Sequence, residues 1–142
     1  MEKTLYQQLI KGARTEALIL FRIEDGSFGK KPFDICGVCQ DGRAIAVEVK
    51  EVSSLDLNKP LPEHIFAEHQ LKWLAVYQLS RALPLIVIHI KGGATYMFVY
   101  NGTKAKLQRP LREYTGGVLT RREGMFTGWT EAMTGSLEST LG

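Results

Sequence analysis

Three residues of this sequence combine acidic and basic chemistry within a short stretch of chain. Asp34 is followed, after thirteen intervening residues, by Glu48-Val49-Lys50. Glu48 and Lys50 lie within AIAVEVKE, residues 44–51, whose β-branched residues predict a strand. Because side chains alternate between the two faces of a strand, Glu48 and Lys50 share one face. The opposite face carries bulky apolar side chains, so the charged face needs a separate explanation.

A cation-binding site is one explanation for this charged face. Asp34 falls in a preceding strand expected over residues 33–40, and the Asp41-Gly42 pair predicts a tight hairpin between the two strands. The hairpin would bring the carboxylates of Asp34 and Glu48 together, and adjacent carboxylates repel each other unless a cation binds them. Lys50 would stand beside them with its ammonium group available to a phosphate or a water molecule. A surface ion pair on an edge strand would produce the same pattern.

Two expected helices each carry one polar residue on a mainly apolar stripe. Glu16 lies on the stripe of a helix predicted over residues 3–22, and Gln70 on that of a helix predicted from about residue 64 to 82. The second stripe contains three aromatic residues, Phe66, Trp73 and Tyr77. Buried polar groups need hydrogen-bond partners, so both polar residues are explained if the helices pack over one polar cleft. A frayed or rotated helix edge would explain each of them as well.

The order of the predicted elements indicates an α/β domain. The first helix is followed by the two hairpin strands, the second helix, and two more strands over residues 84–90 and 94–100. This order is typical of a mixed β-sheet flanked by helices. We expect one domain over residues 1–142, with its core in about residues 3–102 and a peripheral, partly disordered segment over residues 103–142.

Composition and charge narrow the classes of function. The apolar fraction of 44% and the charged fraction of 23% are typical of a globular protein, and no apolar run approaches the roughly 18 to 20 residues that span a bilayer. The N-terminus does not read as a secretory signal, so we expect a cytoplasmic protein without a membrane partner.

The charged residues are unevenly distributed along the chain. Residues 1–70 hold 9 basic and 11 acidic residues, whereas residues 71–142 hold 9 basic and 4 acidic residues. A basic surface beside an acidic site suits a polyanion held against bound metal. A solvated basic surface without a partner fits the charges equally well.

The cysteine and histidine residues do not indicate a zinc site. Cys36 and Cys39 are three positions apart in a predicted strand, so their sulfurs should point to opposite faces, and the sequence has no second cysteine pair to complete four ligands. His64 and His69 are five positions apart, which differs from the HExxH spacing. His89 lies inside an apolar run and is interpreted as a core residue.

Together these residues resemble the signature of the PD-(D/E)xK nuclease superfamily. Within it, the sequence is most similar to the Holliday junction resolvases of the archaeal Hjc and bacterial RecU kinds. The resemblance rests on GARTEALIL, GSFGKKPFD, DGRAIAVEVKE and LPEHIFAEHQLKWL, the last containing His69-Gln70. It covers roughly residues 10 to 100, and it departs from the signature where Phe33 separates Pro32 from Asp34.

The resemblance implies a restriction-endonuclease-like core of αβββαβ type and a metal site. Asp34 and Glu48 would bind Mg²⁺, for which Mn²⁺ would substitute, with the backbone carbonyl of Val49 as a third oxygen ligand. Glu16 would complete the acidic cluster directly or through water. Lys50 would orient or help to deprotonate the hydrolytic water and stabilise the developing charge.

The resemblance also implies a partner and the residues that contact it. Gln70 would position water at the site. The partner would be DNA, contacted through its phosphates and read by its shape. The candidate phosphate contacts are Ser27, Lys30, Lys31, Lys72 and the basic residues from Lys104 to Arg122.

The implied activity is metal-dependent cleavage of four-way (Holliday) DNA junctions, leaving 5′-phosphate and 3′-hydroxyl ends. A homodimer is expected, because symmetric resolution needs two active sites related by a two-fold axis. Two alternatives stay open. One is a repair or restriction-type nuclease acting on linear, nicked or flapped duplex, and the other is a DNA-binding module that keeps the fold but not the chemistry.

Overall fold

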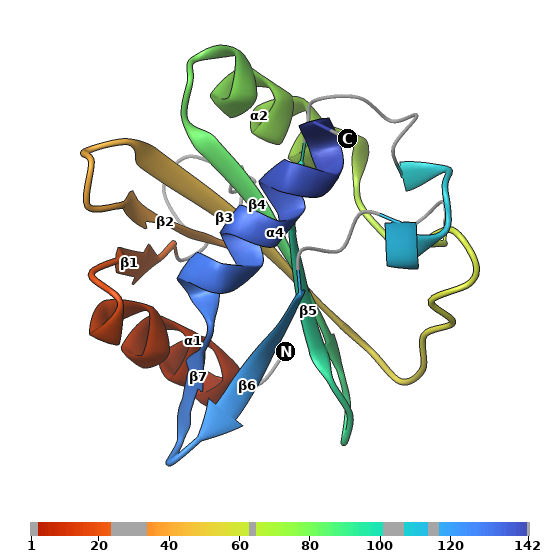
Figure 1. Ribbon diagram of the computed structural model, residues 1–142, viewed down its shortest axis with the longest axis horizontal. Coiled ribbons are helices and arrows are strands. Elements are labelled where there is room, and N and C mark those ends of the chain that lie inside the picture. The colour runs from red at the N-terminus through yellow and green to blue at the C-terminus, as the bar shows by residue number, and fades with distance from the viewer. Residues whose placement is uncertain (1–2, 24–33, 63–64, 101–106, 114–116, 142) are drawn as a thin grey trace.

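Among the described residues, seven strands form one mixed sheet, shown in Figure 1 of the computed structural model. The structure describes residues 3–23, 34–62, 65–100, 107–113 and 117–141. The strands lie side by side in the order of the sequence, and every neighbouring pair is antiparallel except β3 and β4, which are parallel. The strands are β1 Ile19–Arg22, β2 Ile35–Val38, β3 Ala44–Val52, β4 Leu83–Ile90, β5 Thr95–Val99, β6 Gly117–Arg122 and β7 Met125–Thr127.

Helices cover both faces of this sheet. They are α1 Lys3–Thr15, α2 Glu68–Leu79, the short 3-10 helix η1 Leu111–Glu113, and α4 Trp129–Leu141. The chain passes through α2 between the parallel strands β3 and β4, since a parallel pair needs a long crossover. The order α1-β1-β2-β3-α2-β4 is the αβββαβ core that we expected, and the predicted fold class is confirmed. No helix in the described part of the chain has the length and apolar character needed to cross a membrane.

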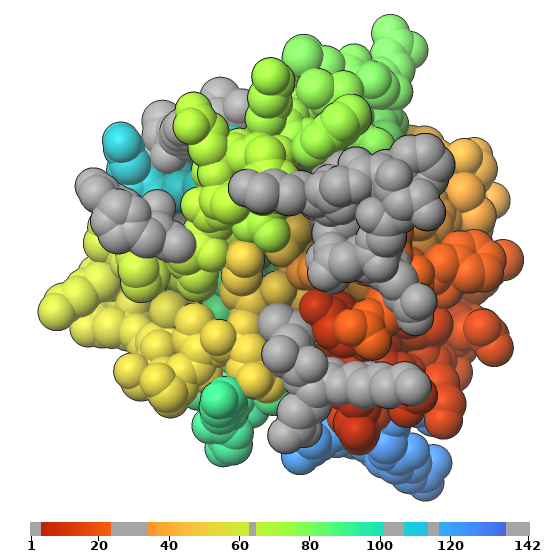
Figure 2. Space-filling view, turned by 180° about the vertical axis from the view of Figure 1, so that it is seen from behind, coloured from red at the N-terminus to blue at the C-terminus, as the bar shows by residue number. Residues whose placement is uncertain are grey.

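Alternating side chains divide the core into two clusters. Ile45 and Val47 of β3 pack on the face covered by α1 and α4, here called the α1 face, whereas Ala46 packs on the opposite face, the α2 face. Figure 1 shows α4 in front of the sheet, and Figure 2, seen from behind, shows α2 in green and the segment after β3 in yellow. The predicted two-faced strand is present, and the α2 face is the one that carries Glu48 and Lys50.

The first helix is shorter than predicted. α1 ends at Thr15, and the residues up to Arg22, which we assigned to the same helix, form β1 instead. Ala17 adopts a left-handed conformation with a φ of 62°, and the amides of Ala17 and Leu18 donate to carbonyls of the last helical turn. This is a Schellman end, which is usually built on glycine. Because alanine occupies this position, no glycine marks the end of the helix in the sequence. The apolar residues continue at helical spacing beyond it, so the predicted helix was too long.

The second helix is present but shorter than the predicted range of about 64 to 82, because it runs from Glu68 to Leu79 and leaves Phe66 before its start. Its buried stripe also differs from the prediction. Leu71 and Leu74 are its buried residues, whereas Trp73 is 47% exposed. Neighbouring residues of a helix point about 100° apart, so burying Leu74 turns Trp73 toward solvent. Phe66 and Tyr77 do pack against the cluster on the α2 face.

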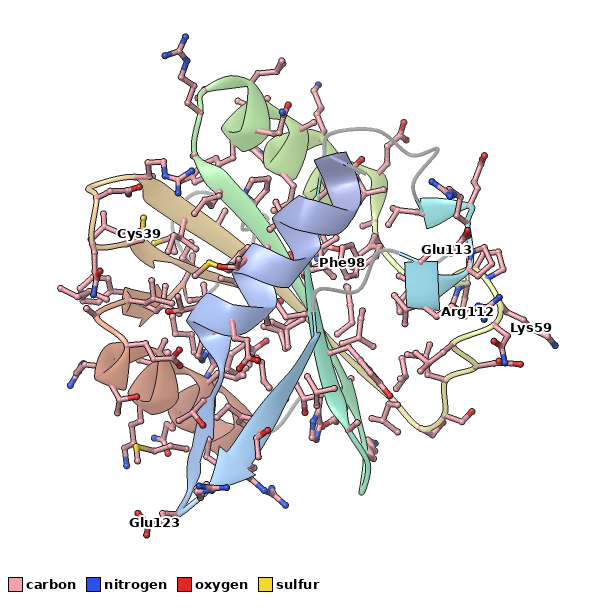
Figure 3. All side chains as sticks on the ribbon, in the orientation of Figure 1. Cys39, Lys59, Phe98, Arg112, Glu113 and Glu123 are labelled. Atoms are coloured by element: carbon pink, nitrogen blue, oxygen red, sulfur yellow. The ribbon has the colours of Figure 1, made fainter. Side chains whose placement is uncertain are left out.

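The C-terminal part belongs to the core. β6 and β7 form a hairpin whose tip residues Glu123 and Gly124 have φ of 54° and 76°, as in a type I′ turn, and Figure 3 shows Glu123 at this tip. Phe126 and Trp129 are 2% and 0% exposed and join the cluster on the α1 face. The structure therefore corrects the expected peripheral placement for residues 117–135, whose short strands have too few residues for their periodicity to be recognised.

The segment after β3 and η1 close the α2 face together. The amides of Leu111 and Arg112 donate to the carbonyls of Lys59 and Leu57, and Figure 3 shows Lys59 beside η1. Leu61 and Leu111 are buried in the cluster on this face. These two segments therefore cover part of the α2 face, which is also the face that carries Glu48 and Lys50.

Candidate metal and catalytic site

The candidate site lies beside the first residue of β2, Ile35, where β3 continues past the part that pairs with β2. β2 pairs with β3 over residues 44–47, whereas β4 accompanies β3 as far as Val52. Asp34 directly precedes β2 and is held at this break by its backbone. Its amide donates to the carbonyl of Val47 at 3.1 Å, and its carbonyl accepts the amide of Ile23 at 2.9 Å. Within the described part of the chain, the edge of β3 beyond Val47 meets side chains on this side instead of another strand.

Asp34 and Glu48 bring two buried carboxylates to this break. Their exposed fractions are 5% and 1%. Ile35 pairs with Val47, so the next two positions, Asp34 and Glu48, are opposite each other and share the α2 face. The amide of Val49 donates to Asp34 Oδ2 at 2.9 Å, which fixes this carboxylate against β3. The structure thus brings the two predicted acids together.

Glu48 is held by partners from its own strand and from α2. Gln70 Nε2 donates to Glu48 Oε1 at 2.8 Å, and Lys50 Nζ lies 3.7 Å from the same oxygen. Gln70 Oε1 in turn accepts the amide of Ala67 at 3.0 Å, as in a capping box at the start of α2. Because the amide oxygen of Gln70 caps the helix, its NH₂ group is left facing Glu48.

Lys50 is placed between the core and the solvent. Its side chain is 24% exposed, and Nζ lies 5.8 Å from the ring centroid of Phe66. A cation above an aromatic face is favourable, and the apolar stem of lysine packs well on such a ring. The ammonium group is therefore positioned by Phe66 and Glu48 while it still reaches solvent, where a substrate could meet it.

The donor atoms at the break suit a hard divalent cation. The amide of Val49 points toward Asp34, and the amide and carbonyl of one strand residue point to the same side, so the Val49 carbonyl also faces the break. Two carboxylates and one carbonyl are oxygen ligands of the kind that Mg²⁺ prefers. Within the part of the chain that the structure describes, no three His, Cys, Asp or Glu residues gather to hold a metal. Among the described residues, Asp34, Glu48 and the Val49 carbonyl are the groups that could hold a cation at the break.

Glu16 lies away from the acidic pair and caps a helix. Its Oε2 accepts the amides of Gly128 and Trp129, and its Oε1 accepts the amide of Thr130, each at 3.0 Å. Gly128 precedes α4 and has no side chain with which to cap it, and a negative charge is favourable at a helix N-terminus. This geometry contradicts the expected role of Glu16 in the acidic cluster. The cap explains the polar residue on the apolar stripe.

Tyr6 of α1 reaches the acidic pair from the other face of the sheet. It is 4% exposed, and its hydroxyl is hydrogen-bonded to the carboxylate of Asp34. Burial and then the negative charge of Asp34 raise the pKa of Tyr6, with a smaller contribution from Glu48, so the hydroxyl keeps its proton. The guanidinium carbon of Arg22 lies 4.4 Å from the centroid of the Tyr6 ring. Sequence reasoning missed Tyr6 because it fits the apolar stripe, although a buried tyrosine hydroxyl usually needs a partner.

The candidate phosphate contacts fall partly outside the described residues. Those outside are Ser27, Lys30, Lys31, Lys104 and Lys106. Lys72 is exposed on α2. The other exposed basic side chains of the expected C-terminal group are Arg109, Arg112, Arg121 and Arg122.

The cysteines and His89 have structural surroundings. Cys36 packs against the cluster on the α2 face and Cys39 against that on the α1 face, so the two sulfurs point apart as predicted. His89 Nδ1 lies 2.7 Å from Thr95 Oγ1, and its ring meets Phe126 edge-on with the centroids 5.9 Å apart. His89 is half-buried and belongs to neither cluster of buried residues, so it lies at the edge of the core, whereas the sequence had suggested a place inside it. His64 lies outside the described residues.

Comparison with known proteins defines the class of fold. The mixed sheet, its flanking helices and the αβββαβ order form the fold of a junction-resolving nuclease. One similar solved structure is Archaeoglobus fulgidus Hjc, a Holliday junction resolvase from an archaeal hyperthermophile, with a TM-score of 0.53 and 14% sequence identity. The match covers 97% of this chain and 99% of that one. At this identity the likeness establishes the fold; no family model and no curated protein matches the sequence.

Proposed function

We propose that this protein is a metal-dependent endodeoxyribonuclease that resolves four-way DNA junctions. The observation that carries the proposal is the pair of buried carboxylates, Asp34 and Glu48, beside the start of β2. Lys50 Nζ lies 3.7 Å from Glu48. The fold shared with a Holliday junction resolvase supports the choice of a branched DNA as substrate.

The site would hold Mg²⁺, with Mn²⁺ as a substitute, on the two carboxylates and the Val49 carbonyl. The chemistry that the ion supplies when bound is activation of a hydrolytic water and polarisation of the phosphodiester. Asp34 is prepared for this task because the Val49 amide fixes the direction of its carboxylate. Glu48 is prepared because Gln70 donates to it at 2.8 Å.

Lys50 would act on the phosphate and on the water. Its ammonium group would stabilise the negative charge that develops as the phosphodiester is cleaved, and it would orient the attacking water or help to remove its proton. Gln70 would keep Glu48 in place and position water nearby. Cleavage of the P–O3′ bond would leave 5′-phosphate and 3′-hydroxyl ends.

The protein would act on DNA as a homodimer. Two symmetric incisions need two active sites related by a two-fold axis. Lys72 on α2 would contact phosphates and so read shape instead of base sequence. The same role would fall to Ser27, Lys30, Lys31 and the basic residues from Lys104 to Arg122. Sedimentation of the purified protein should give about twice the chain mass of 15.9 kDa.

The test is cleavage of labelled DNA by Asp34→Asn and the unmodified protein. A four-way junction, a linear duplex, a flapped duplex and a single strand are each incubated with Mg²⁺ or with EDTA, and the products are sized on a denaturing gel. We expect the unmodified protein to cut the junction in preference to the others and only with Mg²⁺. Asp34→Asn should lose cleavage but keep binding, because one of the two metal-binding carboxylates loses its charge while the fold is retained.

Asp56→Asn is the matched control. Asp56 is exposed in the segment after β3, where its carboxylate accepts the amide of Asn58, and the same chemical change there should leave cleavage intact. If the protein cut a linear or flapped duplex in preference to the junction, the proposed substrate would be wrong but the proposed hydrolysis would stand. Binding that is indifferent to EDTA, without cleavage of any of the DNAs, would overturn the nuclease proposal.

A further inference from the structure

Tyr6 connects α1 to the acidic pair of Asp34 and Glu48. α1 packs on the α1 face of the sheet, whereas Asp34 and Glu48 belong to the α2 face. The hydroxyl of Tyr6 nevertheless meets the carboxylate of Asp34. It can do so because β2 begins only at Ile35, and among the described residues no strand pairs with this edge of β3 beyond Val47.

The carboxylate of Asp34 thereby gains a second donor from a second element. The first donor is the amide of Val49, which holds Oδ2 at 2.9 Å. This bond ties Asp34 to β3 but leaves the carboxylate able to turn about it. The hydroxyl of Tyr6, carried by α1, opposes that rotation. Hydrogen bonds to a ligating side chain commonly set its direction and its affinity for a metal.

Tyr6 is itself held in place. Its ring is buried in the cluster on the α1 face, and the guanidinium of Arg22 lies over it at 4.4 Å from the centroid. Arg22 ends β1, so the order of contacts runs from β1 through the ring of Tyr6 to Asp34. A rigid ring with a single hydroxyl gives the hydrogen bond a fixed direction.

The structure assigns to Tyr6 the role of a positioning residue for the cation site: its hydroxyl holds the Asp34 carboxylate in the direction that binds a divalent ion. This inference rests on the proposed metal site but is independent of the DNA that is cut. Tyr6 acts through Asp34 and needs no contact with substrate.

The test measures Mn²⁺ binding without DNA, by electron paramagnetic resonance of free Mn²⁺ against protein concentration. Tyr6→Phe keeps the ring, its packing and the contact with Arg22, and removes only the hydroxyl. We expect Mn²⁺ affinity to fall by about tenfold, the usual effect of losing a partner of a ligating residue. In junction cleavage, the Mg²⁺ concentration for half-maximal rate should rise by a similar factor, whereas the rate at saturating Mg²⁺ should stay close to that of the unmodified protein.

Tyr100→Phe is the matched control. Tyr100 is 1% exposed in the cluster on the α2 face, so the same loss of a hydroxyl from a buried ring should leave Mn²⁺ affinity unchanged. Arg22→Met gives a second variant outside the core, because Arg22 is exposed. It should weaken Mn²⁺ binding in the same direction and by less, since the ring loses a restraint but keeps its hydroxyl.

The outcomes separate this inference from the proposed function. Unchanged Mn²⁺ affinity in Tyr6→Phe would overturn the inference while leaving the nuclease proposal intact, and so would an equal loss in Tyr100→Phe. Weaker Mn²⁺ binding in Tyr6→Phe, together with an unmodified protein that cuts no DNA, would support the inference and overturn the nuclease proposal. An unmodified protein that binds no Mn²⁺ would overturn both.

Discussion

Asp34 and Glu48 are acidic residues in positions where the sheet would otherwise bury apolar side chains. A buried negative charge is unfavourable unless hydrogen bonds or opposite charges balance it. The Val49 amide and the Tyr6 hydroxyl donate hydrogen bonds to Asp34. Glu48 accepts a hydrogen bond from Gln70 and forms an ion pair with Lys50. Buried acids with such specific partners are candidates for a functional site.

Glu48→Gln should remove the stabilisation of the protein by Mg²⁺. Glutamine keeps the volume of the side chain and an oxygen that accepts from Gln70, but it removes the charge that binds the cation. At a Mg²⁺ concentration of about 100 times Kd, binding should stabilise the unmodified protein by about 2.7 kcal/mol, or roughly 5–10 °C in Tm. Thermal unfolding in Mg²⁺ and in EDTA should show this difference for the unmodified protein and none for Glu48→Gln.

Glu51→Gln is the control for this prediction. Glu51 lies on the same strand and is paired with Lys91 at 3.8 Å, away from Asp34. It should keep the full increase of Tm with Mg²⁺. An increase that survives in Glu48→Gln would mean that the cation is bound elsewhere.

The sequence predicted the strand residues of the site better than the helix residues. Asp34, Glu48 and Lys50 could be placed because a period of two and a hairpin turn determine which strand side chains share a face. The apolar stripe of a helix predicts which residues face the sheet. It does not predict which end of the helix lies near Asp34, where the pairing of β2 with β3 stops. Tyr6 lies within α1 and Glu16 directly follows its last residue, and the structure brings the tyrosine to Asp34 and the glutamate to the start of α4.

At the scale of elements, α1 and α4 depend on each other through unusual end residues. The left-handed residue that follows α1 is Ala17, where glycine is usual, and α4 begins after Gly128, which lacks a capping side chain. Glu16 supplies the missing acceptor from 112 residues away. Such a long-range cap leaves no local pattern, which is why neither the end of α1 nor the start of α4 could be predicted.

Glu16→Ala should destabilise the protein without affecting its metal site. Removal of a helix cap and of charge-assisted hydrogen bonds costs about 1–2 kcal/mol, so Tm should fall by roughly 3–6 °C. Mn²⁺ affinity, measured well below Tm, should be unchanged, because the carboxylate of Glu16 binds the amides of α4. Both quantities come from thermal unfolding and Mn²⁺ titration of the same protein samples.

The control for this change is Glu131→Ala in the first turn of α4. Glu131 is exposed and favours the helix N-terminus through its charge alone, worth about 0.3–1 kcal/mol. It should therefore lower Tm less than Glu16→Ala does. A loss of Mn²⁺ affinity in Glu16→Ala would restore the glutamate to the acidic cluster that the sequence suggested.

At the scale of the whole molecule, the chain after β5 completes the core that supports the site. α1 packs so closely on β7 that a Cβ on Gly12 would lie 1.6 Å from the carbonyl oxygen of Phe126. Phe126, Trp129 and Ala132 share one cluster with Val47 and Val49, the apolar neighbours of Glu48 on β3. α1, which carries Tyr6, is therefore held in place by the C-terminal part of the chain.

Removal of residues 103–142 should abolish cooperative folding, contrary to what a peripheral segment would allow. The deletion removes β6 and β7 from the sheet and α4 from the α1 face, and it exposes Leu9, Ala13 and Met97, which are each 0% exposed in the full chain. A milder change, Trp129→Ala, should cost about 3–5 kcal/mol, which is a large part of the roughly 5–15 kcal/mol that holds a typical domain folded. Val118→Ser on β6, where the side chain is 48% exposed, should leave Tm nearly unchanged. Circular dichroism melts and the dispersion of amide NMR signals measure these effects. A truncated chain that still melts cooperatively would show that residues 3–102 form the core by themselves, and the contacts of α1 with β7 would then be dispensable for the site.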